Sequence, residues 1–156
     1  MSGFALVPRV LGVDFGEARI GVAVSDQLGL LAHPVETIPG NNVSAAARRV
    51  AEIAREKNVE RVIVGLPRHM NGSIGAAAES AKAFAAKLVP LLNCAVELWD
   101  ERLSTTAANR ALRDSGVKTR QTRGIVDQVA AQMILQSYLD SRPTHGEAGA
   151  EISPPK

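Results

Sequence analysis

The chain has 156 residues, of which 46% are hydrophobic and 22% charged, which fits a single globular domain and excludes a wholly disordered protein. Aromatic residues make up only 3%, so the core must be built from aliphatic side chains, and recognition through several stacked bases is disfavoured. The net charge of +2 is too small to indicate a partner, and the one cysteine, Cys94, excludes an internal disulfide and a multi-cysteine zinc site.

The first segments of the sequence predict a three-stranded meander. Two apolar runs, 9–15 and 19–25, flank a short turn that contains Gly16, which is typical of an antiparallel hairpin. A third strand is predicted at 34–38. Since proline cannot donate a ladder hydrogen bond, Pro34 places this strand at a sheet edge.

Helices and strands alternate in the rest of the chain. Apolar residues at helical spacing predict a helix that begins near Ser44. The elements predicted after it are a strand at 61–66, a helix at 75–92, a strand at 95–99, and helices at 104–115 and 124–141. Strands separated by single helices pair in parallel, whereas the meander is antiparallel.

This order predicts an α/β protein with an RNase H-like three-layer fold, in which helices flank a mixed five-stranded sheet. A Rossmann domain is disfavoured because the chain has no G-x-G-x-x-G turn. We expect one domain over residues 1–142 and a disordered tail over 143–156, where proline and glycine replace large apolar residues. No apolar run approaches the roughly 20 residues of a membrane helix, and no export signal is evident. We therefore expect a cytoplasmic protein without a membrane partner.

Four acids fall where predicted strands end or a helix begins. Asp14 lies in an apolar strand, Asp100 and Glu101 directly follow another strand, and Asp127 lies on the shoulder of the last helix's apolar stripe. Each has a plainer interpretation, as a turn hydrogen-bond acceptor or as a helix-dipole partner. If the fold brings them together, carboxylates without His or Cys form an oxygen site that suits Mg²⁺ or Mn²⁺ rather than zinc.

Such a site indicates hydrolysis of phosphodiester bonds. Two divalent ions about 4 Å apart can stabilise the attacking and leaving oxygens of an in-line displacement. No side-chain nucleophile is then required. None is evident, because the chain has neither a Gly-x-Ser-x-Gly motif nor a Walker loop.

Basic residues are concentrated in one segment, 102–123, which carries six cations and one acid and therefore +5, leaving −3 for the rest. The cations are Arg102, Arg110, Arg113, Lys118, Arg120 and Arg123. A cluster of this size can neutralise several phosphates, although a solvated helix face would have the same composition. In the loop 65–73, Arg68 is a further candidate for a phosphate contact.

Several motifs occur in a fixed order: GVDFG at 12–16, RIGVA at 19–23, GLP at 65–67, NGS at 71–73, DERLST at 100–105, and Asp127 before two pairs of apolar residues. This set resembles the YqgF family, over about residues 9–141. Members are described as Holliday junction resolvases and as nucleases that mature the precursor of small-subunit ribosomal RNA. The DERLST string carries most of the specificity.

The resemblance implies a divalent-metal phosphodiesterase site in an RNase H-like fold. Asp14 and Asp127 would be metal ligands, and Glu101 or Asp100 would supply the third. Because adjacent residues of a strand point to opposite faces, only one of these two would point into the site; we favour Glu101, with Asp100, also a catalytic candidate, binding the backbone or Arg102. Family members often have a basic residue after Gly16. Here the first cation after that turn is Arg19, which we expect to contact phosphate.

Three functions compete. The favoured one is a metal-dependent nuclease acting on structured nucleic acid, above all ribosomal RNA precursor, with a resolvase of branched DNA as its variant. The second is a non-catalytic, RNA-binding ribosome assembly factor. The third, an ATP-binding domain of the actin and sugar-kinase type, is disfavoured because 156 residues supply one of the two halves it needs. The protein could be a monomer or a homodimer, and cutting both strands of a junction would need two sites in a dimer.

Overall fold

The computed structural model describes residues 7–67, 75–101 and 120–142, except for the side chains of 120–128. The elements are β1 (Arg9–Phe15), β2 (Arg19–Ser25), β3 (Ala32–Pro39), α1 (Val43–Glu56), β4 (Val59–Leu66), α2 (Ala76–Leu88), a 3-10 turn η1 (Val89–Leu91), β5 (Ala95–Asp100) and α4 (Arg120–Ser141). Their order confirms the predicted one. The helix expected at 104–115 and the tail 143–156 lie outside the described residues.

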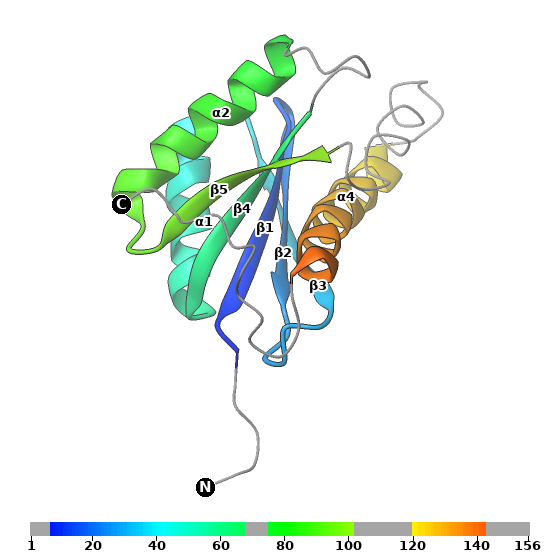
Figure 1. Cartoon of the computed structure of the whole chain (residues 1–156). Helices are drawn as coiled ribbons and strands as arrows, with labels where there is room; N and C mark the ends of the chain where they lie inside the picture. The colour runs from blue at the N-terminus through cyan, green and yellow to red at the C-terminus, as the bar shows by residue number, and fades with distance from the viewer. Residues whose placement is uncertain (1–6, 68–74, 102–119, 143–156) are drawn as a thin grey trace, which may run out of the picture.

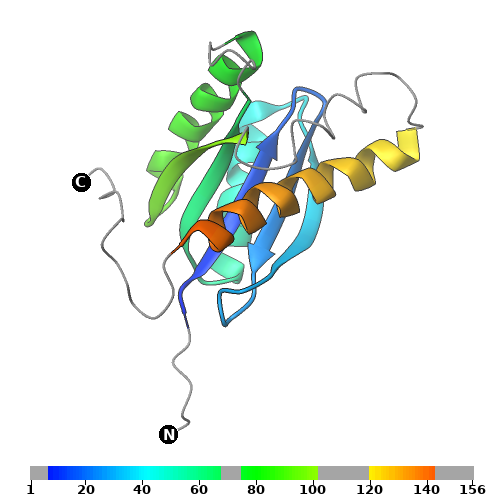
Figure 2. The same cartoon turned by 45° about the vertical axis from the view of Figure 1, so that its right-hand side comes forward.

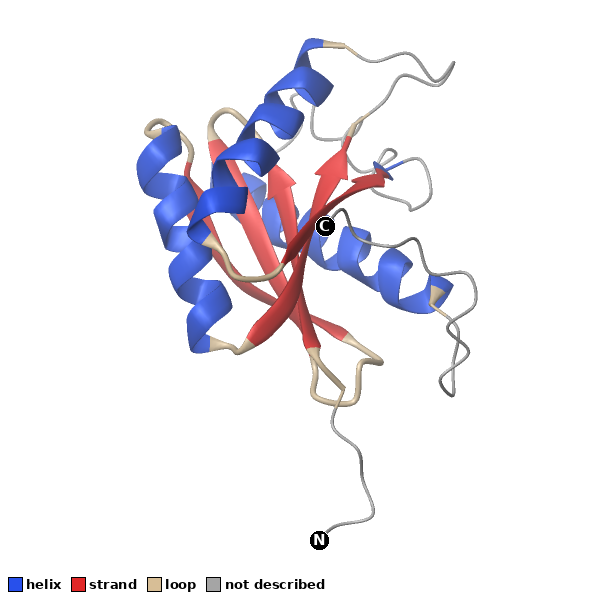
Figure 3. Cartoon of the chain, turned by 60° about the vertical axis from the view of Figure 1, so that its left-hand side comes forward, coloured by secondary structure: helices blue, strands red, loops and turns tan. Residues whose placement is uncertain are grey.

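The five strands form one mixed sheet in the order β3-β2-β1-β4-β5. The β1–β2 and β2–β3 pairs are antiparallel, whereas β1–β4 and β4–β5 are parallel. Helices α1 and α2 cover one face of the sheet and α4 crosses the other (Figures 1 and 2). Figure 3 shows the sheet between the two helical layers. The predicted three-layer architecture and the edge position of the strand with Pro34 are both confirmed.

The layer between the sheet and α1 and α2 is apolar throughout. Alternate residues of β1, namely Leu11, Val13 and Phe15, point into it. The ring of Phe15 packs on that of Phe84 from α2, with 4.8 Å between the ring centroids. Because side chains alternate along a strand, the residues between them, including Asp14, face α4.

The α4 layer is smaller, and glycine allows the helix to come close to the sheet. A Cβ atom at Gly12 of β1 would lie 2.7 Å from the Cβ of Leu135 and 3.2 Å from the carbonyl oxygen of Ala131. At Ala32, the first residue of β3, the backbone N–H donates to the Gln136 side chain of α4 (2.9 Å). Trp99 of β5 donates from its indole Nε1 to Ser137 Oγ at 3.1 Å.

The buried stripe of α4 differs from the predicted one. Its buried residues are Ala130, Ala131, Ile134, Leu135, Tyr138 and Leu139. The helical spacing of the sequence also predicts Met133 and Ser137 in this stripe, but both are only half-buried. The sequence pattern was ambiguous because small and apolar residues occupy most of the helix. Asp127 lies four residues before Ala131 and seven before Ile134 in the same helix.

Local side chains set the ends of two helices. Helix α1 begins at Val43, next to Ser44 as predicted, and Asn42 caps it by accepting from the Ala45 N–H at 3.0 Å. Helix α2 ends at Leu88, four residues before the predicted end, and continues as the 3-10 turn. The cause is Pro90, which has no N–H to donate to an α-helical carbonyl.

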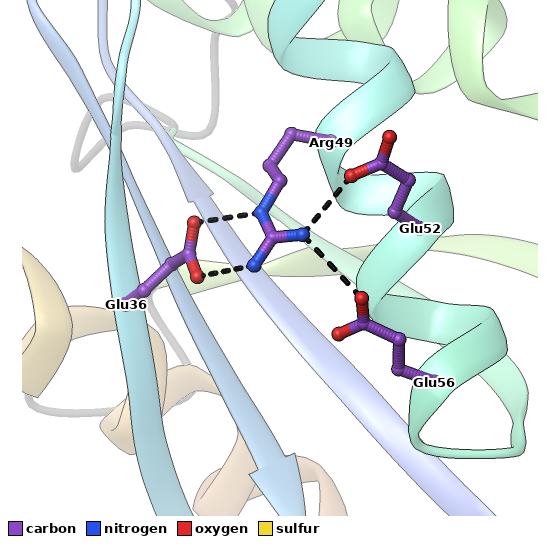
Figure 4. A network of polar contacts seen from close by, with 4 residues as sticks. All are labelled: Glu36, Arg49, Glu52 and Glu56. Carbon is purple, nitrogen blue, oxygen red and sulfur yellow. Dashed lines mark hydrogen bonds and ion pairs between the residues drawn. The ribbon is translucent and has the colours of Figure 1, made fainter.

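Ion pairs join β3 to α1 at the rim of the sheet (Figure 4). Arg49 donates from Nε and Nη2 to the two carboxylate oxygens of Glu36 at 2.9 and 2.8 Å. It also lies 3.0 Å from Glu52 and 3.6 Å from Glu56. None of the helices within the described residues is long and apolar enough to span a bilayer.

Candidate active site

The carboxyl ends of three neighbouring strands meet at one end of the sheet. Strands β1, β4 and β5 are mutually parallel, so their last residues lie at the same end. Asp14 is the second-last residue of β1, and Glu101 directly follows β5. Each is only 2% exposed. In open α/β sheets this end is where ligands bind.

The two buried acids lie on the same face of the sheet. Asp14 stands between Val13 and Phe15, both of which pack under α1 and α2, so Asp14 faces α4. Trp99 faces α4 through its bond to Ser137, and Glu101 is two residues later. Asp100, between them in the alternation, is the half-buried last residue of β5.

Gly65 of β4 lies between these two acids. The β1–β4 register ends at Val13 opposite Val64, so the next pair along it is Asp14 and Gly65. A Cβ atom placed on Gly65 would lie 2.8 Å from Oε2 and 3.3 Å from Cγ of Glu101. The Glu101 side chain therefore lies directly over the bare backbone of Gly65.

This arrangement suits a divalent cation. Two carboxylates buried on one face cost several kcal/mol unless cations, protons or hydrogen-bond donors compensate them. Their oxygen atoms are the hard ligands that Mg²⁺ and Mn²⁺ prefer. Within 7–67, 75–101 and the described side chains of α4, no group of three or more His, Cys, Asp or Glu residues is placed so that it could hold a metal ion. A protein-held site with three ligands therefore needs one from outside that set.

The comparisons with known proteins identify the family. The RuvX family model, described as Holliday junction resolvase, matches residues 8–141. The chain belongs to the RuvX family. This is the YqgF family of the sequence analysis, so that resemblance is confirmed. Membership makes the chain a nuclease-family protein, of the class of hydrolases that cleave phosphodiester bonds.

Relatives and one solved structure agree with this assignment. A Streptomyces avermitilis protein, provisionally named pre-16S rRNA nuclease, is 46% identical over 144 residues, which is 92% of each chain. A Nocardia farcinica protein with the same provisional name is 51% identical over 143 residues, 86% of this chain and 78% of that one. Thermus thermophilus RuvC, solved in complex with a Holliday junction substrate, aligns with a TM-score of 0.56 at 17% identity, over 86% of this chain and 96% of that chain. The similarity to RuvC confirms the RNase H-like fold.

The other predicted residues of this RuvX-family protein are placed only in part. Asp127 lies in α4, one turn before Ala131, and its side chain is outside the described residues. Arg19 begins β2 opposite Pro39 and is half-buried. The remaining predicted cations lie outside the described residues or have side chains that do: Arg68, Arg102, Arg110, Arg113, Lys118, Arg120 and Arg123.

Sequence reasoning missed the role of Gly65 in this site. The predicted strand 61–66 includes Gly65, which is the second-last residue of β4, but the sequence assigned Gly65 no part in the site. The available signal was a glycine at the end of an apolar strand, which often marks a close approach by another group. By contrast, Cys94 is a packing residue. It lies half-buried against the α1–α2 core, and burial raises the pKa of its thiol.

Proposed function

We propose that this RuvX-family protein is a metal-dependent nuclease that hydrolyses phosphodiester bonds in structured nucleic acid, above all in the precursor of small-subunit ribosomal RNA. The observation that carries the proposal is the pair of buried carboxylates, Asp14 and Glu101, on one sheet face beside Gly65. The provisional names of the relatives support the ribosomal substrate. We further propose that residues 1–142 are the nuclease domain, which acts in the cytoplasm.

Asp127 is the proposed third ligand. Residues Ala131 and Leu135 of α4 pack over Gly12 of β1, and α4 runs in the opposite direction to β1 (Figures 1 and 2). Asp14 lies two residues beyond Gly12 along the strand, and Asp127 lies one helical turn before Ala131. Both therefore extend toward the same end of the sheet, which supports a site formed by Asp14, Glu101 and Asp127.

In this proposal the protein binds and orients the reacting groups. Bound Mg²⁺ or Mn²⁺ ions would activate a water molecule and neutralise charge on the leaving oxygen. Asp14 and Glu101 would hold the cation from the two sides of Gly65. Their strands are the two neighbours of β4, and the pairing of the sheet fixes their positions. The Trp99–Ser137 hydrogen bond ties the end of β5, and with it Glu101, to α4. Asp100 would support the site as a positioning residue.

Substrate binding is assigned to the basic segment and to Arg19. Segment 102–123 carries +5 and joins Glu101 to the helix with Asp127. The carboxylates alone would repel a polyanion, so nearby cations are needed to hold phosphates beside them. With aromatics at only 3%, recognition would depend on phosphates and shape, and affinity should fall steeply as salt rises.

The test replaces one carboxylate by the amide of the same shape, which removes the negative charge. In Asp14→Asn, we expect cleavage of ribosomal precursor RNA with Mn²⁺ to fall at least about a hundredfold, because the variant loses an anionic ligand. Asp140→Asn is the matched control, since Asp140 is an exposed acid on α4, and it should cut like the wild type. Equal cleavage by Asp14→Asn would refute the proposed site.

A resolvase activity on branched DNA is the second candidate, and the description of the family model favours it. Matched precursor RNA and four-way-junction substrates, each with and without Mn²⁺, separate the two activities. A resolvase should prefer the junction and form a dimer in light scattering, because it must cut two strands. A non-catalytic assembly factor is favoured instead if two results are found together. The wild type cuts neither substrate, and the variant in which Asp14, Glu101 and Asp127 are all replaced still binds RNA.

A further inference from the structure

The backbone conformation at position 65 does not require a glycine. Among the described glycines only Gly29 has a positive φ, at 74°. Gly65 lies in the regular strand β4, which pairs with β1 on one side and β5 on the other. An alanine could adopt this conformation, and glycine weakens a strand interior relative to alanine. The reason for a glycine must therefore be space.

Two side chains fill the space where a side chain of residue 65 would be. The nearest heavy atoms to an added Cβ are Ile134 Cδ1 at 2.5 Å and Glu101 Oε2 at 2.8 Å. Both residues are almost fully buried, with 0% and 2% exposure, so neither has open solvent into which it could retreat. An added methyl group would displace the Glu101 carboxylate or the Ile134 side chain, or both.

We propose that Gly65 is a positioning residue for Glu101: its missing side chain leaves the volume in which the carboxylate can lie beside Asp14 and bind a divalent cation. This inference rests on the proposed function, since it concerns the same site. It explains why the first residue of the GLP motif is glycine. The proposal also gives β4 a part in the site, because the Glu101 carboxylate lies over its backbone, although β4 contributes no acid.

Packing alone would give a different pattern of effects, because Ile134 belongs to α4 and binds no cation. Ile134→Val removes the Cδ1 atom that is closest to the added Cβ. In the double variant Gly65→Ala, Ile134→Val, the contact with α4 is relieved and the contact with Glu101 Oε2 remains. Stability and cation affinity should therefore respond differently to the second substitution.

The experiment measures Mn²⁺ binding by calorimetry and thermal unfolding of the metal-free protein in four forms: wild type, Gly65→Ala, Ile134→Val and the double variant. We expect Gly65→Ala to weaken Mn²⁺ binding about tenfold or more and to lower the unfolding temperature. Ile134→Val should bind Mn²⁺ within twofold of the wild type. The double variant should recover unfolding temperature relative to Gly65→Ala, while its Mn²⁺ affinity stays low.

Two outcomes would overturn the inference while leaving the proposed function intact. One is a Gly65→Ala protein that binds Mn²⁺ within twofold of the wild type. The other is a double variant whose affinity returns to the wild-type value, because the effect would then pass through α4 packing. A wild-type protein that binds no Mn²⁺ would overturn the proposed function and this inference together.

Discussion

The two faces of the sheet differ in composition and in what they contribute to the protein. The face under α1 and α2 is a continuous apolar core, and its ion pairs, centred on Arg49, lie at the rim between β3 and α1. The face under α4 has fewer buried apolar residues, two glycines in tight contact with other groups, and two buried carboxylates. The first face stabilises the fold through apolar burial. The second face buries less apolar surface, and polar side chains there form the candidate site.

Adjacent residues in β1 show how closely the two roles are joined. Phe15 packs on Phe84 in the apolar layer, whereas Asp14 is buried under α4 at the opposite face. Strand β1 therefore belongs to both layers, and its pairing with β2 and β4 places the Asp14 carboxylate. A functional site benefits from such support, since catalytic geometry tolerates only small displacements.

Removing the largest side chain of the apolar layer should have the largest effect on stability. Phe84 is 1% exposed, and Phe84→Ala is expected to lower the free energy of unfolding by about 3–5 kcal/mol in urea titration. The folded fraction should bind Mn²⁺ like the wild type, because Phe84 touches the face opposite the carboxylates. A loss of less than 1 kcal/mol, or a weaker Mn²⁺ affinity of the folded protein, would contradict this separation of the two faces.

On the other face, Gly12→Ala should impair both stability and activity. The added Cβ would meet the Cβ of Leu135 and the carbonyl oxygen of Ala131, neither of which is a mobile side-chain end, so α4 must shift. We expect a loss of about 1–3 kcal/mol in unfolding free energy and reduced cleavage, since α4 carries Asp127. Urea titration and a cleavage assay test this. Unchanged stability would show that α4 can move away without cost.

The rim pair should contribute least. The hydrogen bonds from Arg49 lower the pKa of Glu36 below its ordinary value of 4.5. Both side chains are about a third exposed, so Glu36→Gln should cost less than about 1 kcal/mol at neutral pH.

The pH dependence of that pair has a definite sign. Because the pKa of Glu36 is lower in the folded state, its contribution is complete above pH 4.5 and is lost as the pH falls through the folded value. Unfolding free energies of wild type and Glu36→Gln should therefore converge below pH 4.5. Exposed Glu60 provides the control as Glu60→Gln. A gap that widens in acid would show that the pair is not the cause.

Local sequence signals predicted most of the fold but not how helix α4 is rotated. The strands, the edge position of Pro34 and the parallel crossovers followed from the alternation of apolar runs and from proline chemistry. The stripe of α4 was misassigned by about one position, because alanine, valine and methionine are compatible with either rotation. The sheet decided between them, since Gly12 and Gly65 admit Leu135 and Ile134 at close range.

By itself, the sequence determined the residue types of the site and their order: an acid in the first strand, a pair of acids after the last strand and an acid in the final helix. The tertiary structure decided that Glu101, not Asp100, is the residue buried on the face of Asp14. It also decided that Gly65 separates the two acids. The physical reason is that strand alternation and register act across distant segments. Which carboxylate shares a face with Asp14 depends on how β5 pairs with β4 and β4 with β1, and no local pattern encodes that.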